Sequence, residues 1–90
     1  QLENLVYLEL RRLGFDVYVG FTRNSEVDFV ARKNDRIVYI QSCYLLIDGK
    51  TVEREYSALE SVGDAYEKYV VSLDDIEMKN RNGIRHIQES

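Results

Sequence analysis

Apolar positions near the start of the chain recur with the period of an α-helix. Between Leu2 and Leu13, the apolar side chains fall on one arc when successive residues are placed 100° apart. The members of this arc are Leu2, Leu5, Val6, Leu10 and Leu13. Gly14 follows where helices commonly end. The pattern predicts an amphipathic helix over Leu2 to Leu13.

After this helix the apolar period changes to two. Alternation over Phe15 to Phe21 predicts a strand with one buried face. Two β-rich runs follow, Val27 to Arg32 and Ile37 to Ser42, and the polar segment Lys33 to Arg36 between them favours a tight hairpin. We expect the second of these runs to continue through Tyr44 to Ile47.

The second half of the chain predicts one more helix and two more strands. Asp48, Gly49 and Lys50 interrupt the β-rich run, and Thr51 can cap a helix that reaches Val62. The apolar run Tyr69 to Leu73 is typical of a central strand, and Ile84 to Gln88 forms the last strand. We therefore predict an α/β fold of order αβββαββ, with a central mixed sheet flanked by the two helices.

Composition limits the chain to one domain over residues 1–90, with a net charge of −4 from 12 basic and 16 acidic side chains. This balance argues against nucleic-acid binding through a strong overall positive field. A single cysteine cannot form an internal disulfide, and no apolar run is long enough to cross a bilayer. We expect a cytoplasmic domain with no membrane partner. Because the chain starts at Gln1 inside the predicted helix, we also expect it to be part of a longer protein.

The predicted hairpin brings polar side chains together. If it turns at residues 34 and 35, the numbers of facing residues sum to 69, so that Asp28 lies opposite Gln41. Strict alternation then places Glu26, Asp28, Gln41 and Cys43 on one face. The apolar residues expected on the other face are Val27, Phe29, Ala31, Val38 and Ile40. Carboxylate and amide oxygens are ligands suited to Mg²⁺.

Three segments resemble the PD-(D/E)XK, or restriction-endonuclease-like, superfamily. They are the helix that carries Glu3 and ends at Gly14 and Phe15, the run Ser25 to Val30, and the run Val38 to Cys43. The resemblance covers half of the chain. It implies a restriction-endonuclease-like core in which a helix glutamate, a hairpin aspartate and a Glu/Gln-x-Lys motif hold Mg²⁺ or Mn²⁺ at a scissile phosphate.

Carried over residue by residue, the resemblance implies a catalytic set of Glu3, Asp28 and Gln41, with Glu3 and Asp28 as the metal ligands. Gln41 matches the branch of the superfamily that uses glutamine. Cys43 departs from the motif, because it occupies the position of the lysine that would activate water and stabilise the phosphate.

A narrower resemblance points to the parent protein. Five segments look like the C-terminal domain of a prokaryotic family of predicted AAA-type ATPases. They are residues 2–7, 26–29, 39–44, 53–56 and 82–84. The resemblance implies that the ATPase domain of the same parent chain is a partner, and that the missing lysine is usual. The chain itself has no Gly-rich nucleotide-binding motif.

Each candidate residue also has a structural interpretation. Glu3 can be a solvated residue of the first helical turn, and Asp28 and Gln41 can lie on a solvent face. Cys43 is more often a small buried side chain than a nucleophile, and His86 is expected to be an exposed strand residue outside any catalytic triad.

Two functions from different classes follow. The first is a degenerate nuclease-like domain that binds nucleic acid or a partner with weak or no cleavage, as Cys43 favours. The alternative is an active metal-dependent nuclease, as the carboxylates favour. Basic side chains at the predicted hairpin tip, Arg32, Lys33 and Arg36, are the candidates for phosphate contact.

Overall fold

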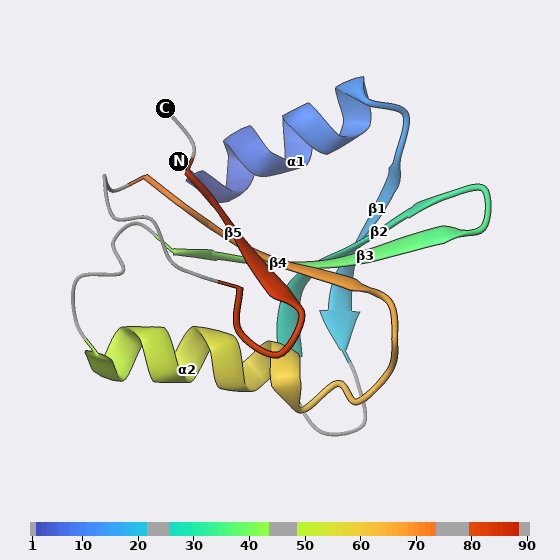
Figure 1. Ribbon diagram of the computed structural model, residues 1–90. Coiled ribbons are helices and arrows are strands. Elements are labelled where there is room, and N and C mark those ends of the chain that lie inside the picture. Colours follow the sequence, from blue (N-terminus) through green and yellow to red (C-terminus); the bar gives the residue numbers. More distant parts are fainter. Residues whose placement is uncertain (1, 22–25, 44–48, 74–79, 89–90) are drawn as a thin grey trace.

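The computed structural model describes residues 2–21, 26–43, 49–73 and 80–88. In chain order its elements are α1 (Leu2–Arg12), β1 (Asp16–Phe21), β2 (Glu26–Lys33), β3 (Arg36–Cys43), α2 (Gly49–Glu60), β4 (Glu67–Ser72) and β5 (Ile84–Gln88). The strands form one five-stranded sheet with α1 over one face and α2 over the other (Figure 1).

The strands lie in the sheet in their order along the chain, β1-β2-β3-β4-β5. The first three are antiparallel neighbours, whereas β4 is parallel to β3 and β5 is parallel to β4. Parallel neighbours need a connection that crosses from one end of the sheet to the other, and α2 provides it between β3 and β4.

The predicted fold class needs a correction. The sequence predicted a restriction-endonuclease-like core, whereas the structure supports only the broader class, mixed α/β. Two helices and a sheet of spatial order β1-β2-β3-β4-β5 describe this fold, and the finer assignment is not retained. Periodicity places elements along a chain, but tertiary packing decides which strands become neighbours and in which direction they run.

Several predicted boundaries also shift. The second helix was expected over Thr51 to Val62 and lies at Gly49–Glu60, and the following strand was expected over Tyr69 to Leu73 and lies at Glu67–Ser72. The expected extension through Tyr44 to Ile47 lies outside the described residues.

Gly14 explains why α1 ends where it does. Its φ of 93° lies in the left-handed region, which favours glycine. The N–H of Gly14 donates to the carbonyl of Arg11 at 3.0 Å, and the N–H of Phe15 donates to that of Leu10 at 3.0 Å. These bonds satisfy carbonyls at the helix end and turn the chain into β1.

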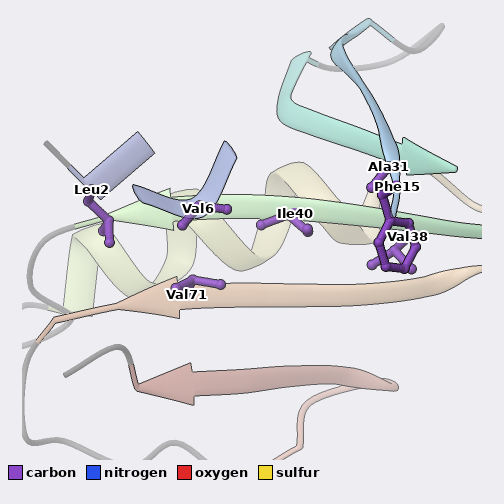
Figure 2. Packing of buried hydrophobic residues seen from close by; sticks show 7 residues of the cluster. All are labelled: Leu2, Val6, Phe15, Ala31, Val38, Ile40 and Val71. Carbon is purple, nitrogen blue, oxygen red and sulfur yellow. The ribbon is translucent and has the colours of Figure 1, made fainter. Parts of the chain in front are cut away.

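Each helix covers a separate hydrophobic cluster. The cluster between α1 and the sheet is drawn in Figure 2 and consists of Leu2, Val6, Phe15, Ala31, Val38, Ile40 and Val71. The cluster between α2 and the sheet consists of Val27, Cys43, Tyr56, Leu59, Val70 and Ile84. The sheet is therefore the middle of three layers, with a core on each side.

A β-bulge interrupts the pairing of β1 with β2. Tyr18 faces Val30 and Gly20 faces Val27, so β2 has two residues where β1 has only Val19. Gly20 is buried at this point, and a side chain there would collide with Val27 and lie 2.8 Å from a methyl carbon of Val30. The close approach of the two strands therefore requires glycine.

Candidate functional site

The hairpin register predicted from the sequence is confirmed. β2 and β3 pair from Phe29 opposite Ile40 to Lys33 opposite Arg36, and the numbers of each pair sum to 69. The turn between them contains Asn34, whose φ of 55° is left-handed. Phe29 is the first residue of β2 in this regular pairing, so Asp28, which precedes it in the chain, lies just outside it.

The predicted division of the two faces is wrong at the end of β2. Phe29 and Ala31 pack against the cluster under α1 as expected, but Val27 belongs to the cluster under α2. The reason is the bulge, because the extra residue of β2 breaks the strict alternation on which the prediction relied.

Asp28 lies at this bulge, and its carboxylate binds β3. Its Oδ2 accepts hydrogen bonds from the backbone N–H of Ser42 at 2.8 Å and from the Ser42 hydroxyl at 3.0 Å. The carboxylate thus takes the place that a backbone carbonyl of β2 would have in a regular ladder. Asp28 continues the attachment of β2 to β3 beyond the last regular pair.

Gln41 connects the same point to α2. Its Oε1 accepts a hydrogen bond from the backbone N–H of Asp28 at 2.5 Å, and its Nε2 donates to Oε1 of Glu55 at 3.1 Å. These two partners fix the orientation of the amide, because an N–H needs an oxygen and a carboxylate needs a donor. Gln41 is buried, contrary to the interpretation as an exposed amide.

Glu55 completes this polar cluster, which we define as Asp28, Gln41, Ser42 and Glu55. Burial raises the pKa of Glu55, the Asp28 charge raises it further, and Arg54 and the Gln41 amide lower it. Arg54 has the larger of the two lowering effects, but it does not cancel the effect of burial, since its guanidinium lies 3.9 Å from the Glu55 carboxylate and its side chain is 72% exposed.

Ser42 and Glu55 are the members of this cluster that sequence reasoning missed. Glu55 lies three residues after Val52 and four before Leu59, so helical spacing places the three side chains on one arc. A carboxylate on such an arc is a signal for a buried polar site, because burying it without partners is unfavourable.

The predicted metal ligands do not converge in the structure as a ligand set. Glu3 is exposed on the first turn of α1, and no contact with Asp28 is found among the described residues. The only oxygen of the Gln41 side chain is directed at the N–H of Asp28. Within the described ranges, no group of three His, Cys, Asp or Glu side chains could hold a metal ion. The arrangement therefore does not fit Mg²⁺ or Mn²⁺ held by Glu3, Asp28 and Gln41.

Cys43, at the position of the expected lysine, is buried in the apolar cluster under α2. The ring of Tyr56 fills the same cluster, and burial together with the nearby Cys43 thiol raises the pKa of its hydroxyl. That hydroxyl is buried and has no hydrogen-bond partner within the described residues. The position thus continues the core and supplies no cation.

The three basic candidates differ in how far they are engaged. Lys33 donates to the carbonyl of Leu13 at 2.8 Å, and Arg36 forms two hydrogen bonds with Glu67 at 2.6 and 2.9 Å. The Arg36 contact, with that of Tyr69, lowers the pKa of Glu67 to about 2. Arg32 is exposed, and no hydrogen bond or ion pair of its side chain is found in the described part of the chain.

His86 is half-buried, whereas it was expected from the sequence to be exposed. Its Nε2 lies 2.6 Å from the hydroxyl of Ser72, which is fully buried on the neighbouring strand. A hydroxyl with no exposed surface cannot reach a substrate, so this pair ties β5 to β4.

Comparison with known proteins gives one informative likeness. No protein family model matches the chain. A protein of Haemophilus influenzae, described only as an uncharacterized protein, is 34% identical to it over 87 residues. The match covers 97% of this chain and 21% of that protein, so the chain spans about a fifth of the relative's length. In the part of the chain that the structure describes, no helix has the length and apolarity to cross a membrane.

Proposed function

We propose that this domain binds a partner polypeptide and does not cleave phosphodiester bonds, although its motifs resemble those of a nuclease superfamily. The orientation of Gln41 carries the proposal. Its oxygen is engaged by the N–H of Asp28 and its amino group by Glu55. The Gln41 oxygen that would have to orient a metal ion is therefore engaged by the backbone, and the Asp28 carboxylate accepts two hydrogen bonds from Ser42.

The position of the expected lysine also supports this proposal. Cys43 is buried where the resemblance expects a lysine, and Arg54 is an exposed side chain beside Glu55. Loss of a group that stabilises developing negative charge typically lowers a reaction rate by a factor on the order of 10² to 10³. A site built in this way favours binding over catalysis.

Charge favours a polypeptide over a nucleic acid as the partner. Two of the three basic candidates, Lys33 and Arg36, already contact groups of the protein, and the net charge is −4. Nucleic-acid affinity depends mainly on the number of phosphate charges that a protein neutralises. The resemblance to the C-terminal domain of an ATPase family suggests that this polypeptide is the remainder of the same parent chain.

One observation favours the second candidate, a metal-dependent nuclease. The charge of Asp28 contributes to the raised pKa of Glu55, and Gln41 forms hydrogen bonds with both residues. A divalent cation between them would relieve this repulsion. Such a site would require Gln41 to leave both of its present partners.

Cleavage assays separate the two candidates. Labelled single- and double-stranded DNA and RNA are incubated with the protein in Mg²⁺ or Mn²⁺, and ion binding is measured by calorimetry. The matched variants are Asp28→Asn, within the polar cluster, and Glu3→Gln, outside it. We expect no cleavage above that of Asp28→Asn. Manganese-dependent cleavage that Asp28→Asn abolishes would overturn the proposal.

Fluorescence anisotropy tests the choice of partner. The same labelled nucleic acids are titrated with the protein and with Arg32→Glu at low and moderate salt. We expect no saturable binding at moderate salt. Saturable binding that Arg32→Glu weakens about tenfold would make nucleic acid the partner instead.

A further inference from the structure

Part of one sheet face is left uncovered by the two helices. Strands lie about 4.8 Å apart and a helix is about 10 Å wide, so one helix covers roughly two strands of a five-stranded sheet. α1 packs over β1, β2 and β3. The cluster beneath it includes Val71 of β4 but no residue of β5 (Figure 2).

An apolar groove lies at this place, with a volume of about 330 Å³. One wall is α1 together with the residue that follows it, and this wall contributes Val6, Leu10 and Leu13. The sheet contributes Ile40, Val71 and Ile87. Ile87 of β5 is 42% exposed, so an apolar side chain of the sheet faces solvent here.

The flank of α1 beside the groove is also apolar and exposed. Leu5 and Leu8 are 45% and 59% exposed, although the sequence placed Leu5 on the buried arc of the helix. Leu5 lies one turn before Glu9, which lines the groove, so Leu5 is on the groove side of α1. A second helix packed over β4 and β5 would contact both this side of α1, at Leu5, and the exposed part of the sheet.

The charges at one end of the groove indicate what the second helix carries. Arg36 lines the groove, and both oxygens of Glu67 accept hydrogen bonds from it. Arg85, opposite Tyr69 on β5, is exposed beside the groove; its charge helps to lower the pKa of Glu67, but no acceptor within the described residues is hydrogen-bonded to it. A carboxylate on the occupant would complete this end of the groove.

We propose that an amphipathic helix with an acidic residue near Arg85 packs in this groove, and that the remainder of a longer parent polypeptide supplies it. The inference rests on the proposed function, for which it names the binding surface. The length of the H. influenzae relative supports a partner in the same chain, since about four-fifths of that protein lie outside the match.

Thiol labelling tests the proposal in the isolated 90-residue chain and in the complete gene product. The variant Ile87→Cys reports on the groove, and Val19→Cys on the far edge strand is its matched control, because Val19 is 66% exposed. Both are made with Cys43→Ser, and circular dichroism confirms folding. We expect Ile87→Cys to react about tenfold or more slowly in the complete protein, with Val19→Cys equally fast in both.

Three results would overturn the proposal. One is equal labelling of Ile87→Cys in the two proteins, and a second is protection that persists unchanged when Arg85→Glu is added. A third is dimerisation of the isolated chain in sedimentation, disrupted by Ile87→Asp, because a second copy would then occupy the groove. None of these results depends on cleavage, so a failure here is distinct from a failure of the proposed function.

Discussion

At the scale of single residues, Gln41 holds two strands and a helix together at one point. Replacing it with leucine removes the acceptor of the Asp28 N–H and the donor to Glu55. Leaving such buried groups without partners destabilises a protein by roughly 1–3 kcal/mol. We expect Gln41→Leu to lower the free energy of unfolding in urea by this amount. Asn4→Leu, on the exposed side of α1, is the control and should change it little.

Glu55 gives a second prediction at this scale, on pH. Because burial raises its pKa in the folded state, its ionisation is disfavoured by folding. The stability that depends on the neutral carboxyl is fully present below the pKa that Glu55 has in the unfolded chain. It is lost as the pH rises through the higher pKa that Glu55 has in the folded protein.

The variant Glu55→Gln keeps an acceptor for the Gln41 amide but cannot ionise. We expect its melting temperature to exceed that of the wild type at pH 7 and to equal it near pH 4. A difference between the two proteins that stays constant from pH 4 to pH 7 would contradict the assigned cause of the pKa shift.

Some features of the polar cluster could be predicted from the sequence, and others could not. The hairpin register could be predicted because a two-residue polar turn fixes which residues face each other, and it brought Asp28 and Gln41 to one place. The hydrogen bonds of Gln41 could not be predicted, since they depend on where α2 places Glu55. Whether Glu3 has a catalytic role stays a prediction.

At the scale of elements, the β-bulge between β1 and β2 makes Gly20 sensitive to a small change. In Gly20→Ala the new methyl group would lie 2.8 Å from a Val30 methyl and 3.0 Å from the Val27 carbonyl oxygen. Overpacking of this kind destabilises by roughly 1–3 kcal/mol. Gly49→Ala at the start of α2, where nothing lies within 4 Å, is the matched control.

Urea unfolding of both glycine variants measures the effect. We expect Gly20→Ala to lose stability and Gly49→Ala to keep or gain it, since alanine favours helix over glycine. If both variants unfold at the same urea concentration, the close approach at the bulge is not a constraint.

Elements themselves were easier to predict than the interruptions within them. Helical periodicity located α1 to within one residue of its end, because the Gly14 signal is local. The bulge left no such signal, since Gly20 fits an alternating pattern as well as any small residue. Its consequence, the transfer of Val27 to the face under α2, is a tertiary effect.

At the scale of the whole molecule, the sequence correctly predicted the α/β class but not the restriction-endonuclease-like core. A local pattern shows that the chain has strands and two amphipathic helices, and the burial on both sides of β3 and β4 agrees with it. The uncovered face over β4 and β5 depends on where α1 crosses the sheet, which no local pattern records. The exposure of Leu5 shows the same limit, because an apolar arc can extend beyond the face that the helix buries in this domain.

The whole molecule also responds to acid in a way that its surface ion pairs determine. Arg12, Arg36 and Arg81 lower the pKa values of Glu9, Glu67 and Glu53, respectively. Lowered values mean that this stabilisation is complete above the unfolded pKa and is lost as the pH falls through the folded one. The stabilisation from Glu67 is lost as the pH falls from about 4.5 to about 2.

These pairs are largely exposed, so salt weakens their contribution at pH 5. At pH 2 most carboxylates are protonated, and the 12 lysines and arginines and one histidine repel one another, so salt instead relieves repulsion. We therefore expect the urea midpoint to fall from pH 5 to pH 2, and to fall less in 0.5 M salt, a concentration at which the screening length is only about 4 Å. A fall of equal size at both salt concentrations would show that buried groups, and not the surface pairs, determine the response of the fold to acid.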